Sequence, residues 1–132
     1  MTLTGQCYCG AVHYEVDGPF AYALNCHCSE CRRRTGSAFK PFAGIARDKL
    51  RVTQGEADLT IFGTAENNNT SCARCGTLLF PVVQDGARVH VTLGTIKGDP
   101  GIRPQAHIFV GSKAPWFEIT DGLKQFEEFP AR

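Results

Sequence analysis

All seven cysteines of this 132-residue chain fall into three short clusters. The central cluster is Cys26-His27-Cys28-Ser29-Glu30-Cys31, and the other two are the pairs Cys7/Cys9 and Cys72/Cys75. An odd number of thiols cannot all pair as disulfides within one chain, and short-range bridges gain little because they close short loops. Two sulfurs bound at ~2.3 Å to one tetrahedral zinc must lie ~3.7 Å apart, which close spacing along the chain allows. The pattern therefore predicts two zinc sites.

The seven thiolates divide naturally into four and three. Four cysteines close a tetrahedral structural site, whereas three leave one position open for water or substrate. We assign the two pairs to the closed, structural site: Cys7, Cys9, Cys72 and Cys75. We assign the central cluster to the open, catalytic site: Cys26, Cys28 and Cys31. His27 is the alternative fourth ligand of that site, although in an extended segment its side chain would point away from its neighbours.

A basic turn follows the central cluster. Ser29 could cap a short helix over residues 30–34, which Gly36 would end. A zinc with three thiolates carries one net negative charge, so the run Arg32-Arg33-Arg34 could offset it and hold an anionic substrate. The alternative is a solvated basic turn. The candidate substrate contacts are Arg34, Thr35, Gly36 and Ser37, with Lys40 as a further cation.

Composition limits the class of protein. Apolar residues make up 42% and charged residues 20% of the chain, which is ordinary for one globular domain spanning residues 1–132. No run approaches the ~20 apolar residues of a membrane span, no signal peptide is visible, and metal-type cysteine spacing favours the cytoplasm. Seven thiolate charges and two divalent ions would change the formal charge from +1 to −2. A nucleic-acid surface is usually strongly basic, so we expect neither nucleic acid nor membrane as partner.

Short alternating runs separated by glycine and proline predict a mainly β fold. The expected strands cover residues 12–16, 20–24, 37–45, 50–53, 59–62, 77–83, 88–93 and 106–110. Residues 77–83 would form a hairpin with 88–93 about Gln84-Asp85-Gly86. In this hairpin His90 points away from the apolar face. Residues 63–70 and 94–104 read as loops, and 123–129 as a weak helix. Trp116 follows a proline, which suggests a fixed ring in the wall of a pocket, but structural packing is the favoured interpretation.

The order of these motifs resembles the glutathione-dependent formaldehyde-activating enzyme family (S-(hydroxymethyl)glutathione synthase-like, with the centromere protein V-type domain). The resemblance rests on the three cysteine clusters, on Thr35-Gly36-Ser37, and on the stretch from His107 to Trp116, and it covers roughly residues 3 to 126. It implies a β-tent of antiparallel sheets around two zinc sites, with the same four-and-three division. It also implies condensation of formaldehyde with glutathione to S-(hydroxymethyl)glutathione, a carbon–sulfur lyase reaction in reverse.

Two classes of function remain open at this point. The first is an enzyme in which the open zinc binds a small thiol, possibly glutathione, and presents its thiolate to an aldehyde. The second is a non-catalytic, zinc-stabilised binding module whose basic turn contacts an acidic partner. Redox sensing and nucleic-acid binding are disfavoured, because no cysteine is left over and the basic turn lacks interleaved aromatic residues. The strand pattern exposes no obvious interface and is silent on oligomeric state.

Overall fold

The computed structural model describes residues 1–130, which form two β-sheets and one short α-helix. The smaller sheet has four strands, in the order β10 (Ile96–Lys97), β1 (Thr2–Gln6), β2 (His13–Asp17) and β5 (Leu50–Gln54). The larger sheet has eight strands, in the order β12 (Lys124–Gln125), β11 (Ala106–Ile108), β3 (Tyr22–Cys26), β4 (Lys40–Ala46), β9 (Arg88–Thr92), β8 (Val82–Val83), β7 (Asn68–Cys72) and β6 (Leu59–Gly63).

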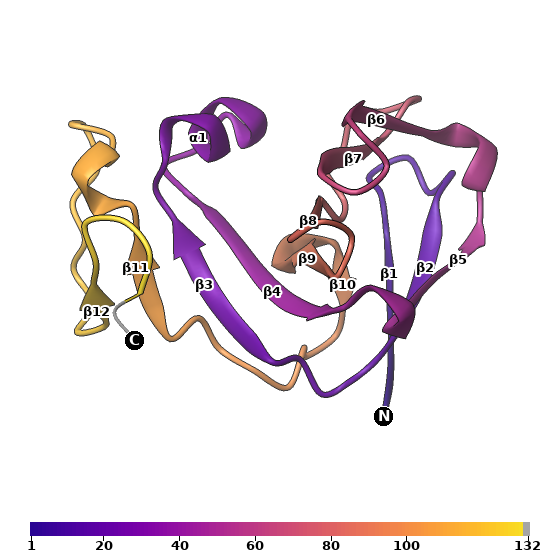
Figure 1. Cartoon of the computed structure of the whole chain (residues 1–132), viewed down its shortest axis with the longest axis horizontal. Helices are drawn as coiled ribbons and strands as arrows, with labels where there is room; N and C mark the ends of the chain where they lie inside the picture. The colour runs from indigo at the N-terminus through magenta and orange to yellow at the C-terminus, as the bar shows by residue number, and fades with distance from the viewer. Residues whose placement is uncertain (131–132) are drawn as a thin grey trace.

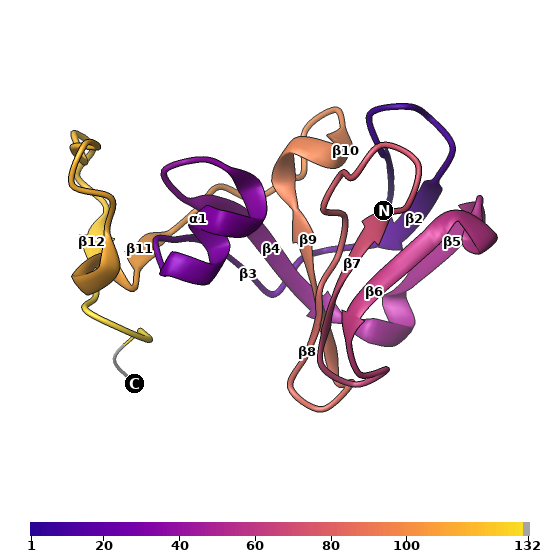
Figure 2. The same ribbon diagram turned by 90° about the horizontal axis from the view of Figure 1, so that it is seen from above.

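Helical elements are short and lie between strands. The α-helix α1 covers Ser29–Thr35 and connects β3 to β4. Single 3₁₀ turns complete the connections: η1 (Arg47–Lys49), η2 (Glu56–Asp58), η3 (Leu93–Thr95) and η4 (Val110–Ser112). Figure 1 shows the larger sheet running from β11 and β12 on one side to β6 and β7 on the other, next to the smaller sheet. Seen from above, α1 lies between these two ends of the larger sheet (Figure 2).

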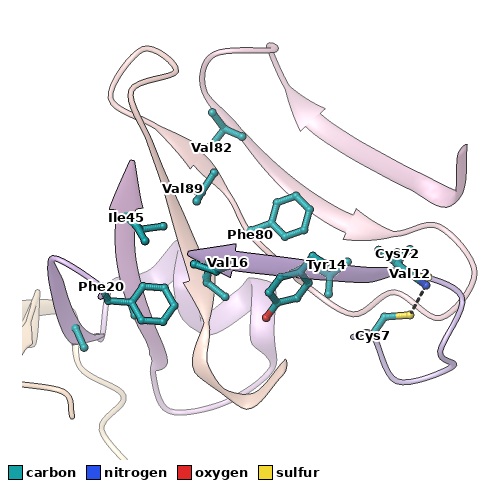
Figure 3. Packing of buried hydrophobic residues seen from close by; sticks show 14 residues of the cluster. Cys7, Val12, Tyr14, Val16, Phe20, Ile45, Cys72, Phe80, Val82 and Val89 are labelled. Atoms are coloured by element: carbon teal, nitrogen blue, oxygen red, sulfur yellow. Dashed lines mark hydrogen bonds between the residues drawn. The ribbon is translucent and has the colours of Figure 1, made fainter. Parts of the chain in front are cut away.

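The main core lies where the two sheets face each other. Alternation along β2 buries Tyr14 and Val16 while His13 and Glu15 stay partly exposed. The Tyr14 ring meets the edge of Phe80, with centroids 5.6 Å apart, and further apolar side chains close around them (Figure 3). Burying each large apolar side chain of this kind stabilises the fold by roughly 1.5–3 kcal/mol.

A smaller apolar cluster lies on one face of the larger sheet, beside the central cysteines. Its buried members are Cys26, Phe42 and Ile108, and Leu24 and Phe126 pack against them. This cluster therefore connects a cysteine of the predicted catalytic site to the strands β3, β4 and β11.

The mainly β fold class is confirmed, with several local differences from the sequence-based expectations. Most pairings are antiparallel, but β11 pairs in parallel with both β3 and β12. Residues 123–129 contain the short strand β12 instead of a helix, because the backbone there pairs with Ala106 and His107. The segment 63–70 is not all loop: β7 begins at Asn68, whose side chain satisfies neighbouring backbone and hydroxyl groups.

Three smaller expectations were wrong. The cap of α1 is Cys28 and not Ser29, because the Cys28 sulfur accepts the Cys31 N–H at 3.2 Å. Of the expected strand over 77–83, only Val82 and Val83 form one, with an isolated bridge at Leu78. The ring of Trp116 is 69% exposed and is not packed in the core.

Candidate metal centres

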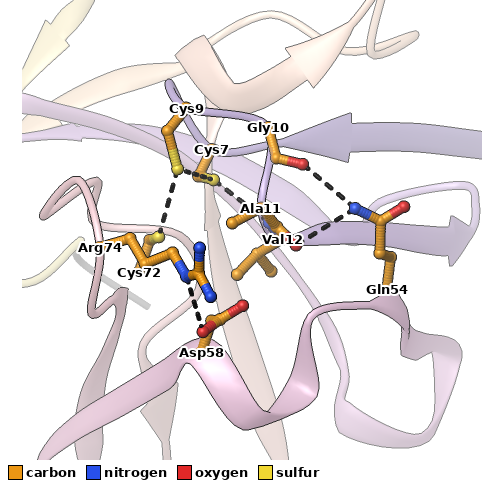
Figure 4. A network of polar contacts seen from close by, with 9 residues as sticks. All are labelled: Cys7, Cys9, Gly10, Ala11, Val12, Gln54, Asp58, Cys72 and Arg74. Atoms are coloured by element: carbon orange, nitrogen blue, oxygen red, sulfur yellow. Dashed lines mark hydrogen bonds and ion pairs between the residues drawn. The ribbon is translucent and has the colours of Figure 1, made fainter.

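The first cysteine cluster joins the two sheets. Cys7 directly follows β1 of the smaller sheet, and Cys9 lies in the turn before β2. Cys72 is the last residue of β7 in the larger sheet, and Cys75 lies in the turn after it. The sulfurs of Cys7 and Cys9 lie 3.7 Å apart and those of Cys9 and Cys72 3.9 Å apart (Figure 4). Together with the Cys75 sulfur, all four lie within 4.8 Å of one another. The predicted four-cysteine group is therefore brought together and could hold a metal ion.

Local hydrogen bonds stabilise these two turns and favour thiolates. The Val12 N–H donates to the Cys7 sulfur at 3.3 Å, and the Cys75 sulfur lies 3.2 Å from the Thr77 hydroxyl. The Thr77 hydroxyl and backbone N–H lower the pKa of Cys75 to about 5, since both contacts stabilise its thiolate. Gly76 takes a φ of +81° where its N–H returns to the Cys72 carbonyl, a conformation that costs glycine little.

The second cluster lies at the junction of β3 and α1. Cys26 ends β3, Cys28 caps the helix, and Cys31 lies within its first turns. Their three sulfurs lie within 4.8 Å of one another, so this cluster could also hold a metal ion. Side-chain hydrogen bonds with Cys26 and Cys31 lower the pKa of Cys28. The same kind of contact with Cys28 and Cys31 raises the pKa of Cys26.

The side chain of His27 is directed away from this group of sulfurs. It is fully buried, and its Nε2 lies 2.7 Å from His107 Nδ1. His107 Nε2 in turn lies 2.9 Å from a carboxylate oxygen of Asp121. The rings of Phe39 and Phe117 pack against the imidazole ring of His27. His27 is therefore engaged in a separate polar chain and is not part of the three-cysteine group.

A cleft of about 670 Å³ adjoins the three-cysteine cluster. Cys31 reaches this cleft, together with the cations Arg33, Arg34 and Lys40. The opposite wall carries Phe62 and a row of amide side chains, Asn67, Asn68 and Asn69. The lining contains these three cations and one carboxylate, that of Glu30. Because positive charge is in excess, the cleft suits an anionic ligand beside the cysteine sulfurs.

The four candidate substrate contacts do not all reach this cleft. Arg34 lines it, and its guanidinium lies 4.6 Å from the centre of the Phe62 ring. Thr35 donates its hydroxyl to the Cys31 carbonyl, and Ser37 donates to the Phe39 carbonyl. Both line a neighbouring hollow of about 340 Å³, which Arg34 and Lys40 also border. Gly36 ends α1 in the left-handed conformation and lines neither space.

Two groups of residues at this site escaped sequence reasoning. The sequence predicts a polar loop at Asn67, Asn68 and Asn69, and no local pattern indicates that these side chains line the same cleft as α1. His107 and Asp121 were not connected to His27, because the contacts span 80 and 14 residues of chain. The only signal was the position of His27 between two cysteines, which places its ring on the other face of an extended strand.

The fold and the two sulfur clusters define a mainly β protein with two candidate metal centres, and comparison with known proteins gives its family. Residues 2–112 match the family model described as "Glutathione-dependent formaldehyde-activating enzyme". A Halomonas elongata protein with the name "Putative glutathione-dependent formaldehyde-activating enzyme" is 29% identical over 128 residues, covering 90% of this chain and 82% of that protein. A Rhodobacter sphaeroides protein of known crystal structure is 33% identical, with a TM-score of 0.61, over 73% of this chain and 89% of that one.

The chain belongs to the glutathione-dependent formaldehyde-activating enzyme family. The resemblance drawn from the cysteine motifs is thereby confirmed. Within residues 1–130, no helix is both long and apolar enough to cross a membrane.

Proposed function

We propose that this protein is a zinc-dependent enzyme that joins a small thiol to formaldehyde, with glutathione as the first candidate thiol. The product would be S-(hydroxymethyl)glutathione, and the reverse reaction is that of a carbon–sulfur lyase. One observation carries the proposal: three cysteine sulfurs lie together at the edge of a cationic cleft, while the nearest histidine is engaged elsewhere. The family name and that of the Halomonas elongata protein support the same reaction.

The donor atoms fit zinc at both clusters. Sulfur separations of 3.7 and 3.9 Å in the four-cysteine group agree with the ~3.7 Å expected around one tetrahedral Zn²⁺. We assign this group, Cys7, Cys9, Cys72 and Cys75, to structural zinc. We assign Cys26, Cys28 and Cys31 to catalytic zinc, because three thiolates leave one ligand position for substrate.

When bound, zinc would supply a position at which a thiol is held as its thiolate at neutral pH. In the reaction the sulfur forms a bond to the aldehyde carbon, the carbon–oxygen π bond breaks, and the thiol proton ends on the oxygen. Arg33 and Arg34 would hold the carboxylates of glutathione in the cleft. Thr35 and Ser37 would contact the substrate only from the neighbouring hollow, and Gly36, which ends α1, would act only through its backbone.

Lys40 lies next to both the three-cysteine group and the cationic cleft. It is directly opposite Cys26 in the pairing of β3 with β4, and only 7% of it is exposed. Its ammonium lies 5.2 Å from the centre of the Phe42 ring and borders the cationic cleft. The positive charge therefore balances the excess negative charge of three thiolates around one divalent ion.

We further infer that residues 1–132 act as one cytoplasmic domain without nucleic-acid or membrane partners. Both sheets contribute side chains to a shared core, which supports a single folding unit. The near-neutral formal charge supports the absence of a nucleic-acid surface.

The reaction can be tested at equilibrium. Glutathione, formaldehyde and their adduct are mixed, and NMR exchange spectroscopy measures how fast the adduct forms and breaks with and without the zinc-loaded protein. We expect exchange to rise in proportion to protein concentration, and to fall to the background rate in Cys28→Ser. Elemental analysis should find two zinc ions in the wild type and one in the variant.

The control is Arg51→Gln, which changes an exposed arginine paired with Glu15 and Asp17 on the smaller sheet. This variant should accelerate exchange as the wild type does. A zinc-loaded wild type that binds glutathione without accelerating exchange would contradict the proposed enzyme and favour the binding module instead.

A further inference from the structure

A second cavity, of about 600 Å³, lies on the same sheet face as Cys26 and is not explained by formaldehyde. The pairing register gives its position. Cys26 shares one row of side chains with Lys40 and Ile108 across the larger sheet. The next row on that face contains Leu24, Phe42, Ala106 and Lys124. Rows on one face of a strand are two residues apart, so the second row lies ~7 Å from Cys26 along β3.

The second row lines the cavity, which is apolar. Leu24, Phe42, Ala106 and Ile108 line it, and Phe126 and Phe129 border it. Phe42 and Ile108 also contact Cys26 in the smaller apolar cluster, so the cavity wall begins at a proposed ligand of the catalytic zinc. The cavity is therefore adjacent to the three-cysteine cluster on one face of the sheet.

Polar groups stand at the far end of the cavity. His90 stacks on Phe42 with ring centroids 4.2 Å apart, and the Tyr22 hydroxyl lies 2.6 Å from His90 Nε2. Gln84, Gln105 and Lys124 complete the lining, which contains one ammonium and no carboxylate among the described residues. An occupant with an uncharged or anionic end fits this lining, and a cationic one does not.

Resting on the proposed function, we propose that the enzyme also accepts aldehydes with an apolar or aromatic substituent, which this cavity binds while the carbonyl carbon lies beside Cys26. Formaldehyde has no substituent and would leave the space unused. The volume is that of a small-molecule site, for which ~300–1,000 Å³ is typical. The reaction balances as before: the sulfur–carbon bond forms, the carbon–oxygen π bond breaks, and the thiol proton moves to the oxygen, giving a hemithioacetal.

The test compares two aldehydes on the zinc-loaded protein. Exchange of glutathione with phenylacetaldehyde and with formaldehyde is measured by NMR in the wild type and in Leu24→Trp, which fills the cavity. We expect the variant to slow phenylacetaldehyde exchange by about tenfold or more and formaldehyde exchange by less than about twofold. Ile61→Trp, in a separate hollow on β6, is the matched control and should affect neither aldehyde, because Ile61 is 50% exposed.

Binding without reaction gives an independent readout. Saturation-transfer NMR with 2-phenylethanol, which has no carbonyl group, should show contact with the wild type and with Ile61→Trp but not with Leu24→Trp. Acceleration of formaldehyde exchange alone, without 2-phenylethanol binding, would overturn the substituent proposal and leave the proposed function intact. If neither aldehyde exchanges faster, the proposed function itself fails. A dimer that Leu24→Trp dissociates would show a second copy covering the cavity, and would also overturn the proposal.

Discussion

His27 Nε2 and His107 Nδ1 lie 2.7 Å apart in the interior of the protein and share one hydrogen bond. The carboxylate of Asp121 accepts from His107 Nε2, so His107 Nδ1 must accept and His27 Nε2–H must donate. The buried Nδ1 of His27 is then a free acceptor, in agreement with the absence of a partner for it among the described residues. This series of hydrogen bonds attaches Asp121, which lies beyond the family-matched residues 2–112, to the segment that carries the three cysteines.

Replacing Asp121 should loosen this attachment. In Asp121→Ala, His107 loses its acceptor at a half-exposed position, and we expect a loss of about 1 kcal/mol in the free energy of unfolding. Urea unfolding at pH 7 measures it. Asp99→Ala is the matched control: Asp99 also accepts a backbone N–H two residues on, as Asp121 does, but its partner Arg103 is exposed, so the loss should be smaller. Equal losses in the two variants would contradict a structural role for the histidine chain.

The two cysteine clusters should respond differently to mutation. Cys72→Ser should lose metal and fold stability together, because structural zinc contributes directly to folding. Cys28→Ser should lose one zinc and stay folded, since its cluster lies within one short segment of the chain. Elemental analysis combined with circular dichroism distinguishes the outcomes. Unfolding of both variants to the same degree would show that the four-and-three division is wrong.

Arg34 should act on substrate binding and not on the chemical step. We expect Arg34→Gln to raise the KM for glutathione by about tenfold with little change in kcat, because a carboxylate contact in the cleft stabilises bound substrate and transition state alike. Steady-state kinetics at varied glutathione concentration measure both constants. A lower kcat with unchanged KM would place Arg34 at the reacting atoms instead.

His90 should make the protein sensitive to acid. Burial lowers the pKa of His90 to about 3, below the value near 6.5 of an unfolded chain. The unfolded state therefore binds this proton first, so stability is full above pH ~6.5 and falls as the pH drops toward 3. Between pH 7 and 5 this single group should reduce the free energy of unfolding by about 2 kcal/mol.

The variant His90→Gln isolates that contribution. It should lose about 2 kcal/mol less than the wild type when urea unfolding is repeated at pH 7, 6 and 5. Its stability at pH 7 will differ from the wild type for other reasons, so the slope with pH is the quantity compared. Parallel slopes would show that folding does not lower the pKa of His90.

Gly44 leaves room for the Tyr22 ring. A Cβ at Gly44 would lie 2.2 Å from Tyr22 Cζ, which no side chain tolerates. We expect Gly44→Ala to displace that ring and cost about 1–3 kcal/mol in urea unfolding. Gly94→Ala is the matched control and should be nearly neutral, because no non-neighbouring atom of residues 1–130 lies within 4 Å of its Cβ position. A neutral Gly44→Ala would mean that Tyr22 can leave its place at no cost.

The cysteine clusters were predictable from the sequence because metal ligation requires close sulfurs, and close spacing achieves this locally. The alternating strands were predictable for a similar reason, since Tyr14 and Val16 mark one face of β2 without outside information. Strand β7 was not, because asparagine has a low strand propensity and only its pairing with β6 and β8 stabilises it. The contact of His27 with His107 depends on the parallel pairing of β3 with β11, which no local pattern encodes.

The placement of the cysteines also has a consequence for the order of events during synthesis. Cys26, Cys28 and Cys31 leave the ribosome together and can capture an ion while most of the chain is still unmade. The group that joins the sheets needs Cys7 from the first strand connection and Cys75 from beyond β7, so it cannot be completed until more than half the chain has emerged. We therefore expect the supply of metal to the newborn chain, and not only its sequence, to decide how much folded protein a cell obtains.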